Sequence, residues 1–138
     1  MSFQNPEDTV IQNYLAEAKN IAVIGLSNKE ERTSYRIARY LQGKGYRIFP
    51  VNPVLAGEEV LGERVYAQLK DIEESIDIVD IFRRSEFLPS IAEEFLATDA
   101  KVFWAQLGIE NENAAQLLQE NKRTAIVMNR CIKIELEK

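Results

Sequence analysis

The sequence has 138 residues, of which 46% are hydrophobic and 28% charged, and its formal net charge is −5. This length suits one domain with a buried core, and the acidic balance argues against binding to nucleic acid or anionic membranes. Histidine is absent and cysteine occurs once, as Cys131. These two facts exclude Ser-His and Cys-His dyads, His-ligated metals and internal disulfides, so we expect neither a metal site nor a catalytic constellation.

No segment approaches the ~20 apolar residues of a membrane span, and the stretch Met1–Pro6 lacks the features of a signal peptide. A cytoplasmic location is therefore expected. The first predicted element is an N-terminal helix at about residues 6–18, with Val10, Tyr14 and Leu15 on one face.

Five short apolar runs, rich in β-branched residues, predict strands covered on both faces. They are Ile21–Ile24, Arg47–Val51, Ile76–Phe82, Lys101–Ala105 and Thr124–Met128. A further edge strand is predicted near Val65 and Tyr66.

Helical spacing of apolar residues fills the intervals between these strands. One helix spans Tyr35 to Leu41, with Thr33 or Ser34 as its N-cap. Two more are predicted, one after Pro89 and one around Ala114–Leu118 that is opened by Asn111 or Asn113. The alternation predicts an α/β fold: a Rossmann-like, doubly wound parallel sheet of five to six strands, forming a single domain over residues 1–138.

The doubly wound strand order 3-2-1-4-5-6 places the strand at Ile21 beside the strand at Ile78. The switch-point crevice, where ligands of open α/β sheets bind, is then bordered by the loops Gly25-Leu26-Ser27 and Phe82-Arg83-Arg84. Residues 21–57 carry six basic and two acidic side chains, whereas residues 58–100 carry four basic and twelve acidic ones. The first βα unit is thus the positive part of an acidic chain.

The first loop has features that suit a phosphate. Gly25 allows a tight turn, Ser27 offers a hydroxyl, Lys29 and Arg32 add positive charge, and the following helix N-terminus offers free N–H groups. The loop matches neither G-x-x-x-x-G-K-[ST] nor G-x-G-x-x-G, so a Walker NTPase and an ordinary dinucleotide site are unsupported. A polar turn with solvated charges is the alternative interpretation.

The ends of the later strands carry further candidates. Asn52 stands where an NAD enzyme commonly has an acidic residue for the ribose, although Asn52-Pro53 is also a frequent turn former. The pair Arg83-Arg84 suits a diphosphate or ribose phosphate, or else is a surface pair that offsets nearby acids.

After the next strand, Gly108 suggests close backbone approach and Gln106 can face the crevice, while Trp104 is interpreted as core. Cys131 is interpreted as a packed thiol rather than a reactive one.

Five strings stand in order at successive strand ends: Ile24-Gly25-Leu26-Ser27, Pro50-Val51-Asn52-Pro53, Asp80-Ile81-Phe82-Arg83-Arg84, Trp104-Ala105-Gln106-Leu107-Gly108-Ile109 and Asn129-Arg130-Cys131. With this set, the chain resembles the CoA-binding domain family, small proteins similar to the nucleotide-binding domain of the succinyl-CoA synthetase α subunit. The resemblance extends from about Tyr14 to Glu135.

The resemblance implies a crevice that holds coenzyme A or an acyl-CoA. Its phosphates would lie at Gly25, Leu26 and Ser27, near the charged Lys29 and Arg32 and the helix start with Ser34 and Tyr35. The turn Val51-Asn52-Pro53 would border the adenosine. The loops with Phe82, Arg83 and Arg84 and with Gln106, Leu107 and Gly108 would flank the pyrophosphate and the pantetheine arm. The synthetase also needs a phosphorylated histidine, which this chain lacks.

We therefore predict a CoA-binding protein without catalysis of its own, with no nucleic-acid or membrane partner. An NAD(P)-dependent oxidoreductase and a protein-partner module with a vestigial nucleotide site are the two alternatives. The sequence predicts no particular protein partner or acyl group.

Overall fold

The computed structural model describes residues 3–138, which form five α-helices and three short 3-10 helices around a parallel sheet. The α-helices are α1 (Asp8–Glu17), α2 (Thr33–Gly43), α3 (Leu88–Leu96), α4 (Glu112–Glu120) and α5 (Ile132–Leu136). The 3-10 helices are η1 (Pro53–Leu55), η2 (Leu69–Asp71) and η3 (Ser85–Phe87). No helix among these residues is long and apolar enough to cross a membrane.

The sheet has five parallel strands in the order β2-β1-β5-β6-β7. They are β1 (Asn20–Ile24), β2 (Arg47–Val51), β5 (Ile78–Ile81), β6 (Val102–Ala105) and β7 (Ile126–Val127). Since β1 pairs with β2 on one side and with β5 on the other, the chain reverses direction across the sheet between β1 and β5. The predicted fold class and switch point are therefore confirmed.

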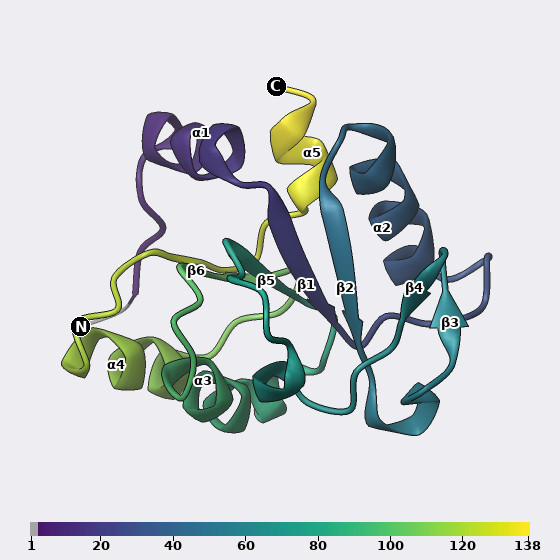
Figure 1. The fold of residues 1–138 in the computed structure, drawn as a ribbon. Coiled ribbons are helices and arrows are strands. Elements are labelled where there is room, and N and C mark those ends of the chain that lie inside the picture. Colours follow the sequence, from purple (N-terminus) through teal and green to yellow (C-terminus); the bar gives the residue numbers. More distant parts are fainter. Residues whose placement is uncertain (1–2) are drawn as a thin grey trace.

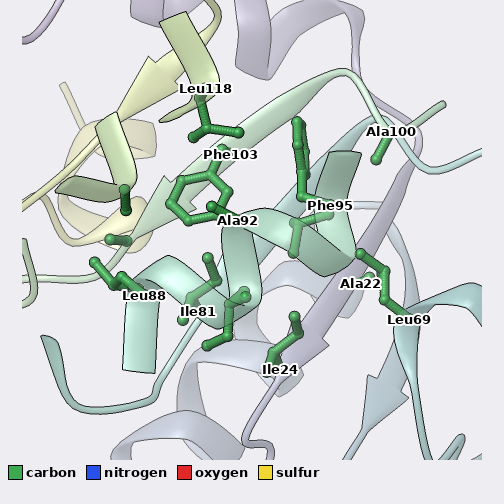
Figure 2. Packing of buried hydrophobic residues seen from close by; sticks show 14 of the residues in the cluster. Ala22, Ile24, Leu69, Ile81, Leu88, Ala92, Phe95, Ala100, Phe103 and Leu118 are labelled. Atoms are coloured by element: carbon green, nitrogen blue, oxygen red, sulfur yellow. The ribbon is translucent and has the colours of Figure 1, made fainter. Parts of the chain in front are cut away.

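Helices cover both faces of the sheet, as Figure 1 shows, with α1, α2 and α5 on one face and α3 and α4 on the other. Each strand alternates its side chains between the two layers. On β5, for example, Val79 and Ile81 pack under α3 and α4, where Phe95 and Phe103 meet edge to face (Figure 2). Ile78 packs on the opposite face. This double cover explains why the strands are continuous apolar runs.

Four local features of the structure differ from the predictions or were missed by them. The edge strand expected near Val65 is reduced to one bridge, between Val51 and Tyr66. A short hairpin, β3 (Glu59–Val60) with β4 (Glu63–Arg64), precedes it and was not predicted. Helix α5 was also missed, because five residues are too short for a periodic pattern.

The fourth correction concerns the start of α2. This helix begins at Thr33, and its N-cap is Arg32, which makes no side-chain cap. Ser34 lies inside the first turn, where its Oγ accepts a hydrogen bond from the Ser27 N–H at 3.0 Å. For the other predicted cap, Asn111 is the residue that opens α4, accepting from the Ala114 N–H.

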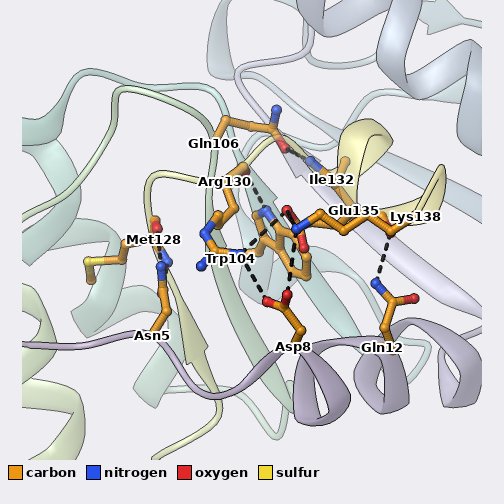
Figure 3. A network of polar contacts seen from close by, with 10 residues as sticks. All are labelled: Asn5, Asp8, Gln12, Trp104, Gln106, Met128, Arg130, Ile132, Glu135 and Lys138. Carbon is orange, nitrogen blue, oxygen red and sulfur yellow. Dashed lines mark hydrogen bonds and ion pairs between the residues drawn. The ribbon is translucent and has the colours of Figure 1, made fainter.

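A polar network joins the two ends of the described chain (Figure 3). Glu135 of α5 is buried, and its Oε2 lies 3.5 Å from Arg130 and 3.2 Å from Lys138. Arg130 also reaches Asp8 of α1 at 3.4 Å, while the Arg130 carbonyl accepts from Trp104 Nε1 at 2.8 Å. These contacts hold α5 against α1 and the sheet, and Trp104 is core, as predicted.

Candidate functional site

The loop after β1 begins with a tight turn at the switch point. Gly25 has a φ of +87°, in the left-handed region that favours glycine, and its N–H donates to the Val51 carbonyl at 2.9 Å. A Cβ at Gly25 would lie 2.8 Å from the carbonyl oxygen of Phe82 and 3.2 Å from the Arg83 side chain. The absence of a side chain therefore lets the two loops that border the switch point touch.

The rest of this loop forms a polar hollow of about 310 Å³ at the start of α2, lined by Gly25, Ser27, Arg32, Thr33, Ser34 and Phe82. The first-turn N–H groups of α2 have no acceptor within the helix, and the helix dipole adds positive character. The Ser27 hydroxyl accepts from the Lys29 N–H, and the Lys29 side chain is exposed. This end of α2 thus presents donors and positive charge, which suits a phosphate.

Two of the site residues predicted in this segment have side chains that pack in or against the core rather than in the polar hollow. Leu26 is 1% exposed and packs in the core, so only its backbone borders the loop. Tyr35 is half-buried against the same core, with the Arg39 guanidinium 5.9 Å from its ring centre.

The turn after β2 is held by its own hydrogen bonds. The Asn52 Nδ2 donates to the Leu26 carbonyl and its Oδ1 accepts from the Val54 N–H, each at 3.0 Å. Each end of the amide makes one hydrogen bond within the protein. These two bonds support the turn and hold it against the first loop.

Beside this turn lies a pocket of about 260 Å³, lined by Ile24, Val51, Pro53, Ala67, Gln68, Arg83, Ile91 and Glu94. Val51 is buried and Pro53 exposed, so they form the floor and the rim. Ala67, Gln68 and Glu94 were not predicted. They come from the connection after β4 and from α3, and no local sequence pattern predicts that they line the crevice.

The loop after β5 supplies the positive charge opposite Gly25. Arg83 is half-buried, its guanidinium carbon lies 4.6 Å from the centre of the Phe87 ring, and it forms no ion pair within residues 3–138. Arg84 is exposed and lies 3.9 Å from Glu86. The two neighbouring arginines thus differ: Arg83 is presented to the pocket by an aromatic support, and Arg84 projects into solvent.

The loop after β6 closes the other side of the site. Gln106 is 4% exposed, and its Oε1 accepts from the Ile132 N–H at the start of α5, at 3.1 Å. Leu107 is exposed, and the Gly108 N–H donates to Asn129 Oδ1 at 2.7 Å. Gly108 has a φ of +83° with open space around its Cα, so its role is the turn rather than close packing.

A third pocket, of about 360 Å³, lies between α2, this loop and α5. It is lined by Thr33, Ile37, Phe82, Gln106, Leu107, Ile109, Cys131 and Ile134. Cys131 is half-buried and lines this pocket together with Phe82 of the switch point. The sequence did not suggest this proximity, because the strand before Cys131 lies two strands away from the switch point. The two residues meet because the chain turns back over the sheet edge after β7 and enters α5.

The third pocket shares Thr33 and Phe82 with the polar hollow at α2, so the two are adjacent. Arg83, which lines the pocket beside Val51, lies next to Gly25, which lines the polar hollow. Three neighbouring hollows therefore follow the carboxyl edge of the sheet, one with a floor at β2, one polar at α2 and one apolar toward α5. Within residues 3–138 no three acidic or cysteine side chains gather in a metal-binding arrangement.

The sequence profile of the CoA binding domain matches residues 19–137, which include all of the segments just described. The chain belongs to the CoA binding domain family. The family resemblance noted from the strand ends is thereby confirmed. A Bacillus subtilis relative, the uncharacterized protein YneT, is 50% identical over 131 residues, which are 95% of each chain.

Larger proteins of the family contain the same domain as one part. The α subunit of ADP-forming acetate–CoA ligase I from Pyrococcus furiosus is 32% identical over 120 residues, covering 79% of this chain but only 26% of that subunit. Among solved structures, a Thermus thermophilus protein designated cell-free ID.343 is 36% identical, with a TM-score of 0.90 over 96% of this chain and 98% of its own. This chain is thus similar to nearly the whole of a small protein and to about a quarter of a ligase subunit.

Proposed function

We propose that this protein binds coenzyme A along the carboxyl edge of its sheet and catalyses no reaction by itself. The observation that carries the proposal is the row of three neighbouring hollows, where Arg83 lies beside the tight turn at Gly25 and Arg32 lies at the N-terminus of α2. Membership of the CoA binding domain family supports coenzyme A as the ligand.

The chemistry of the hollows matches the parts of the ligand in order. The pocket of Val51 and Pro53, with Arg83 beside it, would take the adenosine. The polar hollow at Ser27 and Arg32 would take the diphosphate, where each charge-assisted hydrogen bond contributes about 1.5–3 kcal/mol. The pantetheine arm would then extend past Phe82 toward the apolar pocket.

The absence of catalysis is proposed from the same linings. Among the described residues that line the three hollows, Glu94 is the only carboxylate, and it lies in the pocket proposed for adenosine. The chain contains no histidine to serve as a general base near neutral pH. Within residues 3–138 the Cys131 thiol makes no hydrogen bond to a basic side chain, and its neighbour Arg130 is paired with Asp8 and Glu135.

Calorimetric titration with coenzyme A, dephospho-CoA, NAD, NADP and ATP tests the ligand. We expect coenzyme A to bind most tightly, because its 3′-phosphate adds negative charge near the positive first βα unit. Tighter binding of NAD or NADP would instead favour an oxidoreductase, against which the presence of Asn52 in place of an acidic residue counts.

Incubation with acyl-CoA esters, followed by measurement of released thiol, tests the second half of the proposal. We expect only the background rate. Release above background that disappears in a Cys131→Ser variant would show that the protein is an enzyme.

A further inference from the structure

The third pocket differs in character from the other two. Of its eight lining residues, only Thr33 and Gln106 have oxygen- or nitrogen-bearing side chains, and the walls are otherwise aliphatic, aromatic or thiol. A free thiol at the end of a pantetheine arm does not need such a lining. An alkyl group does, because its removal from water provides the binding energy.

The rim of this pocket exposes two large aliphatic side chains. Leu107 is 63% exposed and Ile134 is 50% exposed, and they come from different elements, the loop after β6 and helix α5. Single exposed leucines are ordinary on protein surfaces, but here two flank one hollow that is already apolar. A ligand with an alkyl end would cover both.

Gln106 provides the polar group that such a ligand would need. Its side chain is nearly buried and its Oε1 is occupied by the Ile132 N–H. Figure 3 shows the amide nitrogen pointing away from Ile132. This nitrogen donates to no acceptor within residues 3–138, and Gln106 lines the pocket. An amide donor in an apolar pocket selects a carbonyl oxygen, because leaving the donor unpaired costs free energy.

We infer that the pocket of Phe82, Gln106, Leu107 and Ile134 holds the acyl end of a short-chain acyl-CoA, whose thioester carbonyl accepts a hydrogen bond from Gln106 Nε2. This inference rests on the proposed function and goes beyond it, because it makes acyl thioesters, rather than free coenzyme A, the preferred ligands. The protein then distinguishes acylated from free coenzyme A by one hydrogen bond and one apolar surface.

The test is a calorimetric series with free coenzyme A, acetyl-CoA, propionyl-CoA and butyryl-CoA. Each methylene buried in the pocket is expected to tighten binding about fourfold. Ile134→Asp places a charge on the rim, and we expect it to abolish the increase along the series, measured as the affinity of each ester relative to that of free coenzyme A for the same variant. Val54→Asp is the matched control, because Val54 is 87% exposed outside this pocket, and it should leave the series unchanged.

Gln106→Glu provides a second readout. Glutamate retains an oxygen for the Ile132 N–H but replaces the donor with an acceptor, so the preference for esters over free coenzyme A should fall about tenfold. Thermal melting shows whether this variant folds, and the Ile134→Asp series decides the matter if it does not. Equal or weaker binding of all the esters, with coenzyme A still bound by the parent, would overturn the acyl pocket and leave the proposed function standing. If the parent binds neither coenzyme A nor its esters, both proposals are wrong.

Discussion

Both edges of the parallel sheet are hollowed, and the larger hollow is at the edge that we do not propose as the site. At the amino edge, a cavity of about 410 Å³ lies between α1 and the strand starts, lined by residues that include Tyr14, Glu17, Asp77 and Lys101. Two of its three charged side chains, Asp77 and Lys101, are paired with each other, whereas Glu17 is exposed and forms no ion pair within residues 3–138. Asp77 Oδ2 accepts from the Lys19 and Asn20 N–H groups, each at 2.9 Å, and Lys101 lies 3.4 Å from Asp77.

The carboxyl edge has smaller hollows but groups without partners. Arg32 and Arg83 form no ion pair within residues 3–138, and the first turn of α2 directs its N–H groups to the same place. In a parallel sheet with helical crossovers, the helix N-termini point toward this edge. The comparison teaches that free N–H donors and unpaired positive charge, rather than cavity size, distinguish the edge that we propose as the site.

The largest effect on stability is expected from adding a side chain at Gly25, where the two loops of the switch point meet. Gly25→Ala should destabilise the protein by about 2–4 kcal/mol, because it combines a left-handed φ with a clash against the Phe82 carbonyl. Gly108→Ala is the matched control, since its φ is similarly positive but a Cβ meets nothing within 4 Å. It should cost only the backbone strain, about 1 kcal/mol. Equal denaturant midpoints for the two variants would contradict the close approach.

The next largest effect is expected on the affinity for coenzyme A, when one positive side chain is removed from each edge of the sheet. Arg83→Gln should weaken coenzyme A binding by about 1.5–3 kcal/mol, which is roughly 10- to 150-fold, through loss of a charge-assisted contact. Lys101→Gln removes the same charge at the amino edge and should change the affinity less than twofold, because its partner is Asp77. If calorimetry shows equal losses, net charge rather than position governs binding, and the distinction between the edges fails.

The sequence was sufficient to predict the order of the strands and the two loops at the switch point. Continuous apolar runs mark buried parallel strands, and crossover handedness then leaves few arrangements. Gly25 and Arg83 could be placed because they directly follow strands whose ends meet at one edge. Local pattern and fold rules together carry that much information.

The details of the site depend on contacts between residues far apart in the chain. The amides of Asn52 and Gln106 bond to partners 26 residues away in the sequence, and no local signal indicates which atoms of such an amide are bonded within the protein. Cys131 and Ile134 enter the crevice only because the short helix α5 folds back over the sheet. Tertiary packing decided these positions.

Strand β5 contains a carboxyl group without a partner in the described protein interior, and its effect on stability can be measured. Asp80 is fully buried on the face of α1, α2 and α5, and neither carboxylate oxygen has a partner within residues 3–138. Burial raises the pKa of Asp80 well above its ordinary 3.8. Asp80→Val should therefore stabilise the protein by about 1–2 kcal/mol at neutral pH, because it removes an unpaired polar group.

The pH dependence of that gain has a definite sign. A carboxyl with a raised pKa in the folded state contributes most favourably below its unfolded value, and the parent loses stability as pH rises toward the folded value. The advantage of Asp80→Val should thus be smallest below about pH 4 and grow with pH. Denaturant titrations at several pH values measure it, and a gain that shrinks with rising pH would show that Asp80 has a donor in solution.

The smallest expected effect comes from Asp77, which directly precedes the same strand. Although burial opposes the shift, the N–H groups of Asn20 and Lys19 and the Lys101 ammonium lower the pKa of Asp77. Asp77→Asn should destabilise the protein at neutral pH by only about 1 kcal/mol, because the carboxylate is partly exposed and screened by solvent.

A depressed folded pKa contributes stability above the unfolded value, and that contribution is lost as pH falls through the folded value. The deficit of Asp77→Asn should consequently be present at pH 7 and shrink as the pH falls below about 4, the reverse of the trend for Asp80→Val. Measured in the same titrations, two carboxyl groups three residues apart should give opposite pH slopes. Parallel slopes would mean that the hydrogen bonds at the amino edge do not hold the Asp77 carboxylate in its charged form.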